Sequence, residues 1–252
     1  MYTFKEDINY KVHFWFDKQG VRNKKWARLP KASKAIYSVI MCHRNKHGIA
    51  IPSQETIAIL SGTTEKTVRV GIDGLLTFPG FRVESYVTSR GHRAKKYITE
   101  LPPREKGRAF PFFKSVITGG NWSRLKPSAQ ALYPVLRTFS FFDGEEYAVR
   151  IDDDREYYYN VDDMIGDGVF WEREFDFVDA DDDILAEYAG IGINSLNSAI
   201  SDLEEHFLIE KTEPIAGSRK TFKVFRTPPM RYTPEGMNRK IAKRNGNNHL
   251  NM

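Results

Sequence analysis

Apolar residues recur at helical spacing between residues 53 and 76, and the pattern is interrupted once, at Gly62. The apolar positions are Ile57, Ala58 and Leu60 before the interruption and Val68, Ile72 and Leu75 after it. The second set lies at i, i+4 and i+7, which gives that helix one buried face. Gly62 occupies a turn that needs a positive φ, and Thr64 is placed to cap the second helix. The pattern predicts a helix-turn-helix.

A strand pattern follows the second helix directly. Phe81–Val87 and Ala94–Thr99 alternate apolar and polar residues, and the turn-forming stretch 88–93 lies between them. A β-hairpin placed immediately after a helix-turn-helix is typical of a winged helix. The segment is therefore predicted to fold as a winged-helix module.

The same order of patterns occurs twice in the chain. Trp26-Ala27-Arg28-Leu29 recurs 96 positions later as Trp122-Ser123-Arg124-Leu125. From Ile57 onward the offset is 128, so the second copy carries an insertion. Self-similarity of this kind predicts two copies of one unit, over residues 10–103 and 110–229. We expect an α+β fold class, with two tandem winged-helix domains as a pseudo-repeat.

A helix is expected before each helix-turn-helix, with one face turned inward. The inward positions are Ala35, Ile36, Val39 and Ile40 in the first copy and Ala131, Leu132, Val135 and Leu136 in the second. Their spacing predicts an amphipathic helix that completes a three-helix core in each copy.

The insertion coincides with a strongly acidic block. Residues 143–183 hold 17 Asp and Glu against 3 Lys and Arg. Three segments of it have strand-like patterns, namely Glu146–Ile151, Arg155–Val161 and Val169–Val178. We expect an acidic β-rich insertion over about 143–180, and a basic flexible tail over 230–252.

Charge is distributed unevenly along the rest of the chain. Residues 1–120 carry 22 Lys and Arg against 9 Asp and Glu, and a basic half favours a polyanionic partner such as nucleic acid. Cys42 is the only cysteine, which excludes an internal disulfide and a cysteine-based zinc finger and favours a reducing, cytoplasmic location. No apolar run approaches the roughly 20 residues of a membrane span, so no membrane partner is expected.

The first recognition helix and its wing carry the candidate DNA contacts of the first copy. They are Thr64, Lys66, Thr67 and Arg69 on the helix and Arg90, His92, Arg93, Lys95 and Lys96 on the wing. A helix fits the DNA major groove, about 12 Å wide, and the wing cations would hold phosphates that set register rather than sequence. The alternative is an ordinary solvated helix face, but the basic cluster beside the helix favours double-stranded DNA.

The second recognition helix differs because it has no basic residue. Its candidate contacts are Asn194, Ser195, Asn197 and Ser198, with Arg219 and Lys220 on the wing. Asparagine reads adenine through paired hydrogen bonds. A neutral helix can equally form a dimer surface, so a second copy of the chain is also considered as a partner.

The acidic block also allows an enzymatic interpretation, in which runs of aspartate bind metal ions of a nuclease. The runs are Asp152–Asp154, Asp162–Asp163 and Asp181–Asp183. Consecutive residues of a strand point to opposite faces, and carboxylates before a helix complement its dipole. Solvated acidic turns, or an acidic surface facing a basic one, are therefore favoured over a metal site.

Two further enzymatic patterns are incomplete. Tyr157–Tyr159 suggests a nicking enzyme with a tyrosine nucleophile, but no His-x-His motif accompanies it. His43 and His47 lie four apart at a predicted helix end, where a structural role is favoured over zinc. A Gly-rich phosphate loop is also missing from the sequence. We therefore expect no catalytic residues, no metal and no cofactor.

The segments Trp26–Tyr37 and Ile51–Arg69 resemble the helix-turn-helix domains of plasmid and phage replication proteins and of related regulators. The resemblance covers about 26–76 well and 122–229 more weakly. The tandem plan is similar to that of plasmid replication initiators, which bind repeated origin sites, often as monomers, and repress their own gene as dimers. In those initiators the second module is the stronger reader, whereas here the first is more basic.

The resemblance implies a replication initiator whose two heads contact successive major grooves, about 34–36 Å apart on one face of the duplex. A dimeric transcription regulator without a role at an origin is the alternative. A metal-dependent nuclease targeted by winged helices is a third hypothesis, and incubation of plasmid with Mg²⁺ or Mn²⁺ tests it.

Overall fold

The computed structural model describes residues 13–89, 91–102, 107–140, 175–212 and 220–226. The elements of the first half are β1 (His13–Asp17), α1 (Gln19–Arg22), α2 (Lys25–Arg28), α3 (Lys31–Cys42), β2 (Ile49–Ala50), α4 (Gln54–Ser61), α5 (Glu65–Leu75), β3 (Phe81–Val87) and β4 (Arg93–Thr99). Those of the second half are β5 (Ala109–Phe113), α6 (Ser115–Thr118), α7 (Asn121–Arg124), α8 (Pro127–Phe139), β6 (Phe175–Ala180), α11 (Asp182–Ala189), α12 (Ile193–Glu205), β7 (Ile209–Thr212) and β8 (Lys220–Phe225). Helices and strands therefore follow the same order in both halves of this mixed α+β structure.

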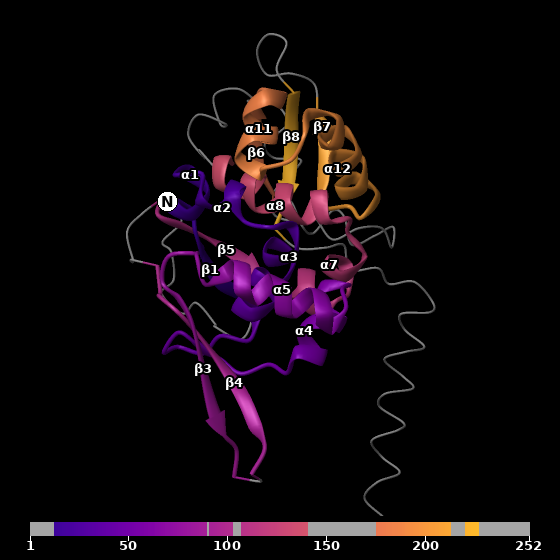
Figure 1. Ribbon diagram of the computed structural model, residues 1–252. Coiled ribbons are helices and arrows are strands. Elements are labelled where there is room, and N and C mark those ends of the chain that lie inside the picture. The colour runs from indigo at the N-terminus through magenta and orange to yellow at the C-terminus, as the bar shows by residue number, and fades with distance from the viewer. Residues whose placement is uncertain (1–12, 90, 103–106, 141–174, 213–219, 227–252) are drawn as a thin grey trace, which may run out of the picture.

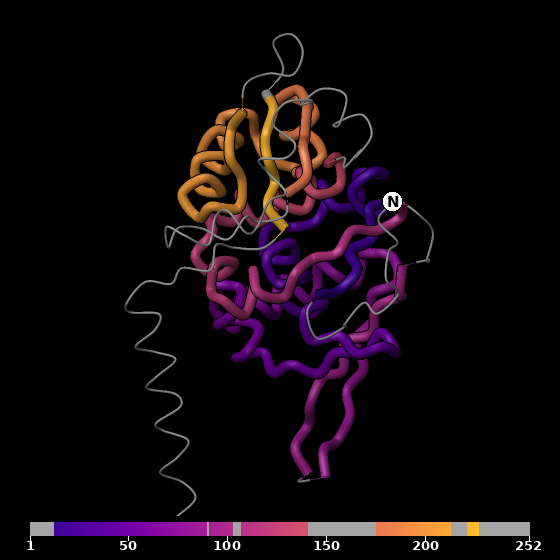
Figure 2. The backbone as a smooth tube through the Cα atoms, turned by 180° about the vertical axis from the view of Figure 1, so that it is seen from behind, coloured from indigo at the N-terminus to yellow at the C-terminus, as the bar shows by residue number. Residues whose placement is uncertain are grey.

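Each half contains one three-stranded antiparallel sheet. The strand order is β2-β4-β3 in the first half and β6-β8-β7 in the second, so the two sheets have the same topology. The β3–β4 and β7–β8 hairpins extend toward opposite ends of the molecule (Figure 1). A third, two-stranded sheet joins the halves, because β1 pairs antiparallel with β5. Seen from behind, β5 crosses the middle of the molecule between the two halves (Figure 2).

The helices α3 and α8 pack against each other at the centre and are buried nearly all round. Residues 33–42 of α3 and 129–138 of α8 are buried without exception. This corrects the expectation of one inward face for each helix. The reason is that α3 lies between α4 and α5 of its own half and α8 of the other half. Buried apolar residues of both halves consequently form one continuous core.

The two halves exchange equivalent contacts across this centre. Trp26 donates its indole N–H to the carbonyl oxygen of Ala131 at 3.0 Å. Trp122 donates its indole N–H to the carbonyl oxygen of Ala35 at 2.8 Å. Trp26 and Trp122 lie 96 positions apart in the sequence, and so do the acceptors Ala35 and Ala131. Each tryptophan therefore makes the same contact with the central helix of the opposite half. Two segments that exchange the same contact in this way are related by an approximate twofold axis, as the subunits of a symmetric dimer are.

The aromatic residues of β1 and β5 follow the same symmetry. Phe16 stacks on Phe110 with ring centroids 5.0 Å apart, and Phe14 stacks on Phe112 at 4.9 Å. All four rings are buried, and stacked aromatic pairs of this kind stabilise by about 0.5–1.5 kcal/mol beyond the area they bury. The stacked rings lie on strands that pair with each other, and they thereby help to hold the two halves in one relative position.

The turn of each helix-turn-helix also touches the opposite half. Gly62 and Gly190 end α4 and α11 with φ angles of 68° and 62°. A Cβ added to Gly62 would overlap the carbonyl of Ser123, and one added to Gly190 would overlap the carbonyl of Ala27. Glycine is therefore required at both turns, first by the left-handed backbone and then by the close approach of another chain segment.

Polar side chains from the central helices hold the ends of α4 and α11. Gln130 donates to the carbonyl oxygens of Ser61 at 3.0 Å and Trp122 at 2.8 Å. At the corresponding position, Lys34 donates its ammonium group to the carbonyl oxygens of Ala189 at 2.7 Å and Ala27 at 3.0 Å. Burial, and secondarily the charge of Lys31, lowers the pKa of Lys34 to about 8. A neutral amide thus fixes the first helix-turn-helix, and a cation fixes the second.

Candidate nucleic-acid interface

Local capping builds the first helix-turn-helix as the sequence predicts. Ser53 caps α4 by accepting a hydrogen bond from the backbone N–H of Thr56 at 3.0 Å. Thr64 caps α5 by accepting from the backbone N–H of Thr67 at 3.2 Å. The chain turns between the two helices at Gly62, in the left-handed conformation. The two caps stabilise the N-terminus of each helix, and packing holds α5 against α4.

The recognition helix α5 presents a polar stripe to solvent. Val68, Ile72 and Leu75 are buried as predicted. The exposed residues at i, i+3, i+4 and i+7 are Lys66, Arg69, Val70 and Asp73. Thr67 is half-buried, and its hydroxyl lies 3.0 Å from that of Thr64. The structure therefore places Lys66 and Arg69 together on one accessible face, with Thr64 and Thr67 occupied in the cap.

The wing of the first half is a regular two-stranded hairpin. β3 pairs with β4 from Phe81↔Thr99 to Val87↔Arg93, and Gly91 turns between them at a φ of 77°. His92, Arg93 and Lys95 are exposed. Lys96 is half-buried and forms an ion pair with Glu84 at 2.7 Å on the neighbouring strand. Arg90 lies outside the described residues.

The helix α12, which corresponds to α5 in the second half, has the same exposed stripe with different chemistry. Leu196, Ala199, Ile200 and Leu203 are buried. The exposed stripe consists of Asn194, Asn197, Ser198 and Ser201, and Ser195 is half-buried. No charged residue belongs to this stripe. Lys126, which precedes α8, donates its ammonium group to the hydroxyl of Ser198 at 3.4 Å and thus brings a cation to the helix from another element.

The wing of the second half is less basic where it is described. Lys211 pairs with Glu204 at 2.8 Å, and Lys223 pairs with Glu210 at 3.4 Å. Arg219 lies outside the described residues, and Lys220 is placed in β8 by its backbone only. Among the described cations of this wing, charge is offset by neighbouring carboxylates, in contrast to the wing of the first half.

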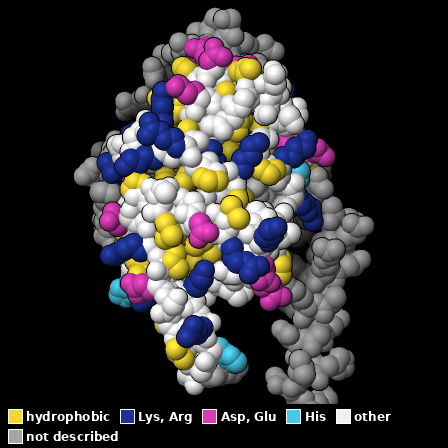
Figure 3. Space-filling view, in the orientation of Figure 1, with side chains coloured by type: hydrophobic (Ala, Val, Ile, Leu, Met, Phe, Trp, Pro, Cys, Tyr) yellow, Lys and Arg dark blue, Asp and Glu magenta, His cyan; other side chains and the backbone are white. Residues whose placement is uncertain are grey.

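Figure 3 shows the face on which α5 and its wing lie. Lys and Arg side chains are spread over this face, both on the β3–β4 hairpin and across the middle of the molecule. Asp and Glu side chains are scattered between them. The face is thus mixed in charge, with cations on the wing and elsewhere and no single continuous basic surface.

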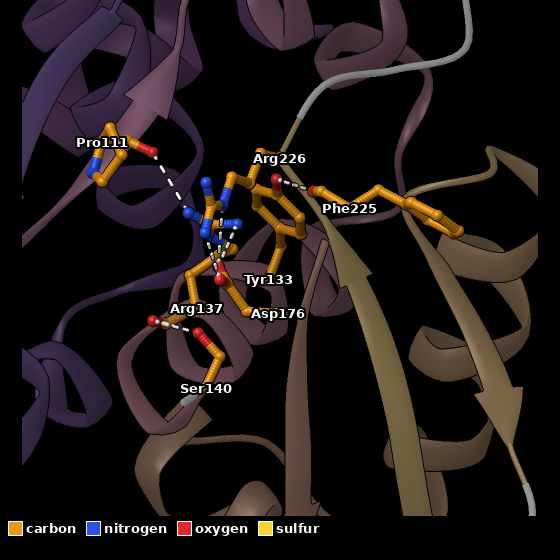
Figure 4. Close-up of polar contacts among 7 residues, drawn as sticks. All are labelled: Pro111, Tyr133, Arg137, Ser140, Asp176, Phe225 and Arg226. Atoms are coloured by element: carbon orange, nitrogen blue, oxygen red, sulfur yellow. Dashed lines mark hydrogen bonds and ion pairs between the residues drawn. The ribbon is translucent and has the colours of Figure 1, made fainter. Parts of the chain in front are cut away.

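The acidic block shows a different role from the one the sequence suggests. Phe175–Ala180, expected within the insertion, forms β6, the strand that pairs with β8. Its Asp176 is buried between Arg137, 2.9 Å away, and Arg226, 2.7 Å away (Figure 4). Burial raises the pKa of Asp176, but the charge of Arg137 and the hydrogen bond and charge of Arg226 outweigh it and lower the pKa. Residues 175–180 therefore belong to the sheet of the second half and not to an insertion, which corrects the predicted boundary.

The other acidic runs fall into two groups. Asp181 is the N-cap of α11, and Asp182 and Asp183 lie in its first turn, where carboxylates complement the helix dipole. Asp152–Asp154 and Asp162–Asp163 lie outside the described residues, as do Tyr157–Tyr159 and the tail 230–252. Within the described part of the chain, no three His, Cys, Asp or Glu side chains are close enough together to hold a metal ion.

Comparison with known proteins gives one match. Residues 27–76 match a family model described as a helix-turn-helix domain. This range contains α3, α4 and α5 and ends before the wing. No curated protein and no solved structure matched the chain. The chain therefore contains a helix-turn-helix domain, and such a domain indicates DNA binding. None of the described helices is long and apolar enough to cross a membrane.

Two residues of this surface were not among the DNA contacts predicted from the sequence, although Val70 was predicted on the outward face of the second helix. Val70 belongs to the exposed stripe of α5 and is 54% exposed. The period of the helix already places it beside Lys66 and Arg69, and apolar side chains contact thymine methyl groups in the major groove. Lys126 had no local signal, because only the packing of α8 against α12 brings it to Ser198.

Proposed function

We propose that the protein binds double-stranded DNA sequence-specifically through two winged-helix modules, without enzymatic activity. The observation that carries the proposal is the helix-turn-helix domain at residues 27–76, followed by a hairpin with exposed cations. The second half contributes the same order of helices and strands, which supports a second module of the same kind.

The approximate twofold relation of the halves supports a specific arrangement on DNA. Two recognition helices related by such an axis meet half-sites of opposite orientation, one helical turn or about 34–36 Å apart. The two half-sites differ in sequence, because α5 presents Lys66 and Arg69 whereas α12 presents Asn194 and Asn197. Arginine and lysine favour guanine, and asparagine favours adenine. One chain therefore occupies two grooves without a second copy.

We assign the biological role to initiation of replication of a plasmid or another mobile element. The resemblance of 26–76 and 122–229 to plasmid replication initiators supports this role, and so does the presence of two heads in one chain. A dimeric transcription regulator remains the second candidate function. Mapping the bound site distinguishes the two, because an initiator binds beside an origin and a regulator beside a promoter.

Selection from a random duplex library tests the proposal. We expect an enriched site with two unequal, inverted halves, bound with an affinity that falls steeply as salt rises, because phosphate neutralisation dominates binding. Enrichment of a single half-site would contradict the two-module arrangement. A flat salt dependence, or retention of no duplex at all, would overturn DNA binding itself.

A further inference from the structure

Two exposed corners of the fold carry cations that the recognition elements do not include. The first corner is residues 28–31, where α2 ends and α3 begins, and the second is residues 124–126, between the end of α7 and the start of α8. Their exposed basic residues are Arg28 and Lys31 in the first corner and Arg124 and Lys126 in the second. We call these four residues the central cationic band. In the part of the chain that the structure describes, the side chains of Arg28, Lys31 and Arg124 make no ion pair or hydrogen bond.

The two arginines correspond to each other in the two halves. Arg28 and Arg124 lie 96 positions apart, each two residues after the buried tryptophan that crosses to the opposite half. Each tryptophan is fully buried, whereas each arginine is exposed. Burial explains the tryptophan at both positions, but no packing requirement explains an unpaired arginine at both.

The first corner lies between the two helix-turn-helix units. On one side it packs on its own recognition helix, since Ser33 donates its hydroxyl to the carbonyl oxygen of Gly71 at 2.8 Å. Pro30 also packs there, 3.0 Å from where a Cβ on Gly74 would lie. On the other side, the carbonyl of Ala27 touches Gly190, in the turn before α12. Arg28 and Lys31 therefore lie between α5 and the start of α12.

The second corner repeats this placement with the halves exchanged. The backbone N–H of Lys126 donates to the carboxylate of Asp202 at 2.7 Å, and its ammonium group donates to Ser198 at 3.4 Å, both on α12. The carbonyl of Ser123 touches Gly62, in the turn before α5. Arg124 and Lys126 therefore lie between α12 and the start of α5, on the other side of the approximate axis.

We propose that the central cationic band is a phosphate-binding site that holds the DNA backbone between the two major grooves. The inference rests on the proposed function, because two recognition helices in successive grooves leave a stretch of backbone facing the region between them. The twofold relation places one corner on each strand of that stretch. Each arginine directly follows the residue whose carbonyl approaches the turn glycine of the opposite half, so phosphate contact there would hold the two heads together on the duplex.

The test uses the full chain with both arginines replaced, Arg28→Gln and Arg124→Gln, and a fluorescent random-sequence duplex of about 30 base pairs, which spans two grooves. Anisotropy titrations over about 50 to 300 mM salt give the slope of log K against log salt. Each lost phosphate contact lowers the slope by about 0.9, so the double variant is expected to lose about 1.8. Its affinity at about 0.1 M salt falls roughly eightfold for each contact.

Two controls distinguish the effect of cations in the central cationic band from the effect of the protein's net charge. Lys46→Gln removes an exposed cation beyond the opposite end of α3 from α5 and leaves the slope unchanged. Arg28→Lys with Arg124→Lys keeps both charges and retains most of the slope. Lys31→Gln with Lys126→Gln repeats the loss with independent residues. All of these side chains are exposed, and unchanged thermal unfolding confirms that each variant folds.

The outcomes distinguish this inference from the proposed function. A folded Arg28→Gln, Arg124→Gln variant that binds with the wild-type slope overturns the phosphate site while leaving two-headed DNA binding intact. A loss of about 0.9 in Lys46→Gln, equal per charge to that of the double variant, also overturns it, because the effect is then one of net charge. Failure of the wild-type chain to bind the duplex at the lowest salt overturns the proposed function instead.

Discussion

The helix α5 and its counterpart α12 share a framework and differ at every exposed position of the stripe. Lys66, Arg69, Val70 and Asp73 correspond, 128 positions later, to Asn194, Asn197, Ser198 and Ser201. The first helix presents charge and one apolar residue, and the second presents only amides and hydroxyls. Under the proposed function the same scaffold separates two tasks, because cations contribute affinity for phosphates and neutral polar groups discriminate between bases.

The side chains that hold the helix-turn-helix units in place differ in charge in the reverse way from the exposed stripes. The neutral Gln130 holds the end of α4, which precedes the charged helix α5. The cationic Lys34 holds the end of α11, which precedes the neutral helix α12. A buried lysine without a carboxylate partner is costly, and the low pKa of Lys34 expresses that cost. Four predictions test whether the two heads are equivalent in structure and unequal in chemistry.

The largest effect is expected at the turns. Gly62→Ala and Gly190→Ala each force a side chain into the left-handed region and against a carbonyl of the opposite half. The two costs together predict a loss of roughly 3 to 4 kcal/mol of unfolding free energy for each variant. Gly120→Ala is the matched control, because its φ is 81° and no atom lies within 4 Å of the added Cβ. Urea unfolding that shows equal losses at all three glycines would contradict the contact between halves.

The second-largest effect is expected when the charge of Asp176 is removed. Asp176→Asn leaves Arg137 and Arg226 together without their carboxylate, and all three residues belong to the second half. We expect a loss of about 3 kcal/mol in urea unfolding. The folded pKa of Asp176 lies below its ordinary value, so its contribution is present above about pH 4 and is lost as pH falls further. A variant as sensitive to acid as the wild type would contradict this assignment.

The third prediction concerns the chemistry of the heads. Lys66→Gln with Arg69→Gln should lower the salt slope of binding to a random duplex by about 1.8, with an affinity loss of roughly 60-fold at about 0.1 M salt. Asn194→Ala should leave that slope unchanged and instead reduce discrimination within the selected site by about 1–3 kcal/mol. Anisotropy with selected and random duplexes measures both. An equal change of slope in both variants would remove the division of tasks.

The smallest effect concerns the lysine that supports the second head. The pKa of Lys34 is about 8 when folded and about 10.4 when unfolded, so the unfolded chain binds more protons between these values. The unfolding free energy of the wild type should therefore rise with pH across this window, relative to Lys34→Gln, by about 1 to 2 kcal/mol at about pH 9.5. Glutamine is the residue that the chain itself uses at the corresponding position 130. Parallel pH profiles for the two proteins would refute the buried, charged state of Lys34.

The sequence predicted the local elements well because their causes are local. The hairpin expected at Phe81–Val87 and Ala94–Thr99 agrees with β3 and, within one residue, with β4. The turn at Gly62 and the cap at Thr64 also hold, since both depend on neighbouring backbone groups. The strand over 175–180 was wrongly assigned to the acidic insertion for the opposite reason: the partners that neutralise Asp176 lie at positions 137 and 226, far away in the chain.

By itself, then, the sequence determined the two sets of helices and strands, the helix-turn-helix turns and the residues that each recognition helix exposes. These follow from periodicity, capping and glycine conformation, which act over a few residues. Only the tertiary structure decided that α3 and α8 are buried all round, that Lys34 is enclosed while Arg28 and Arg124 stay exposed, and that each half supports the turn of the other. Those outcomes depend on which distant segment covers a side chain, and neither hydrophobic period nor charge count contains that information.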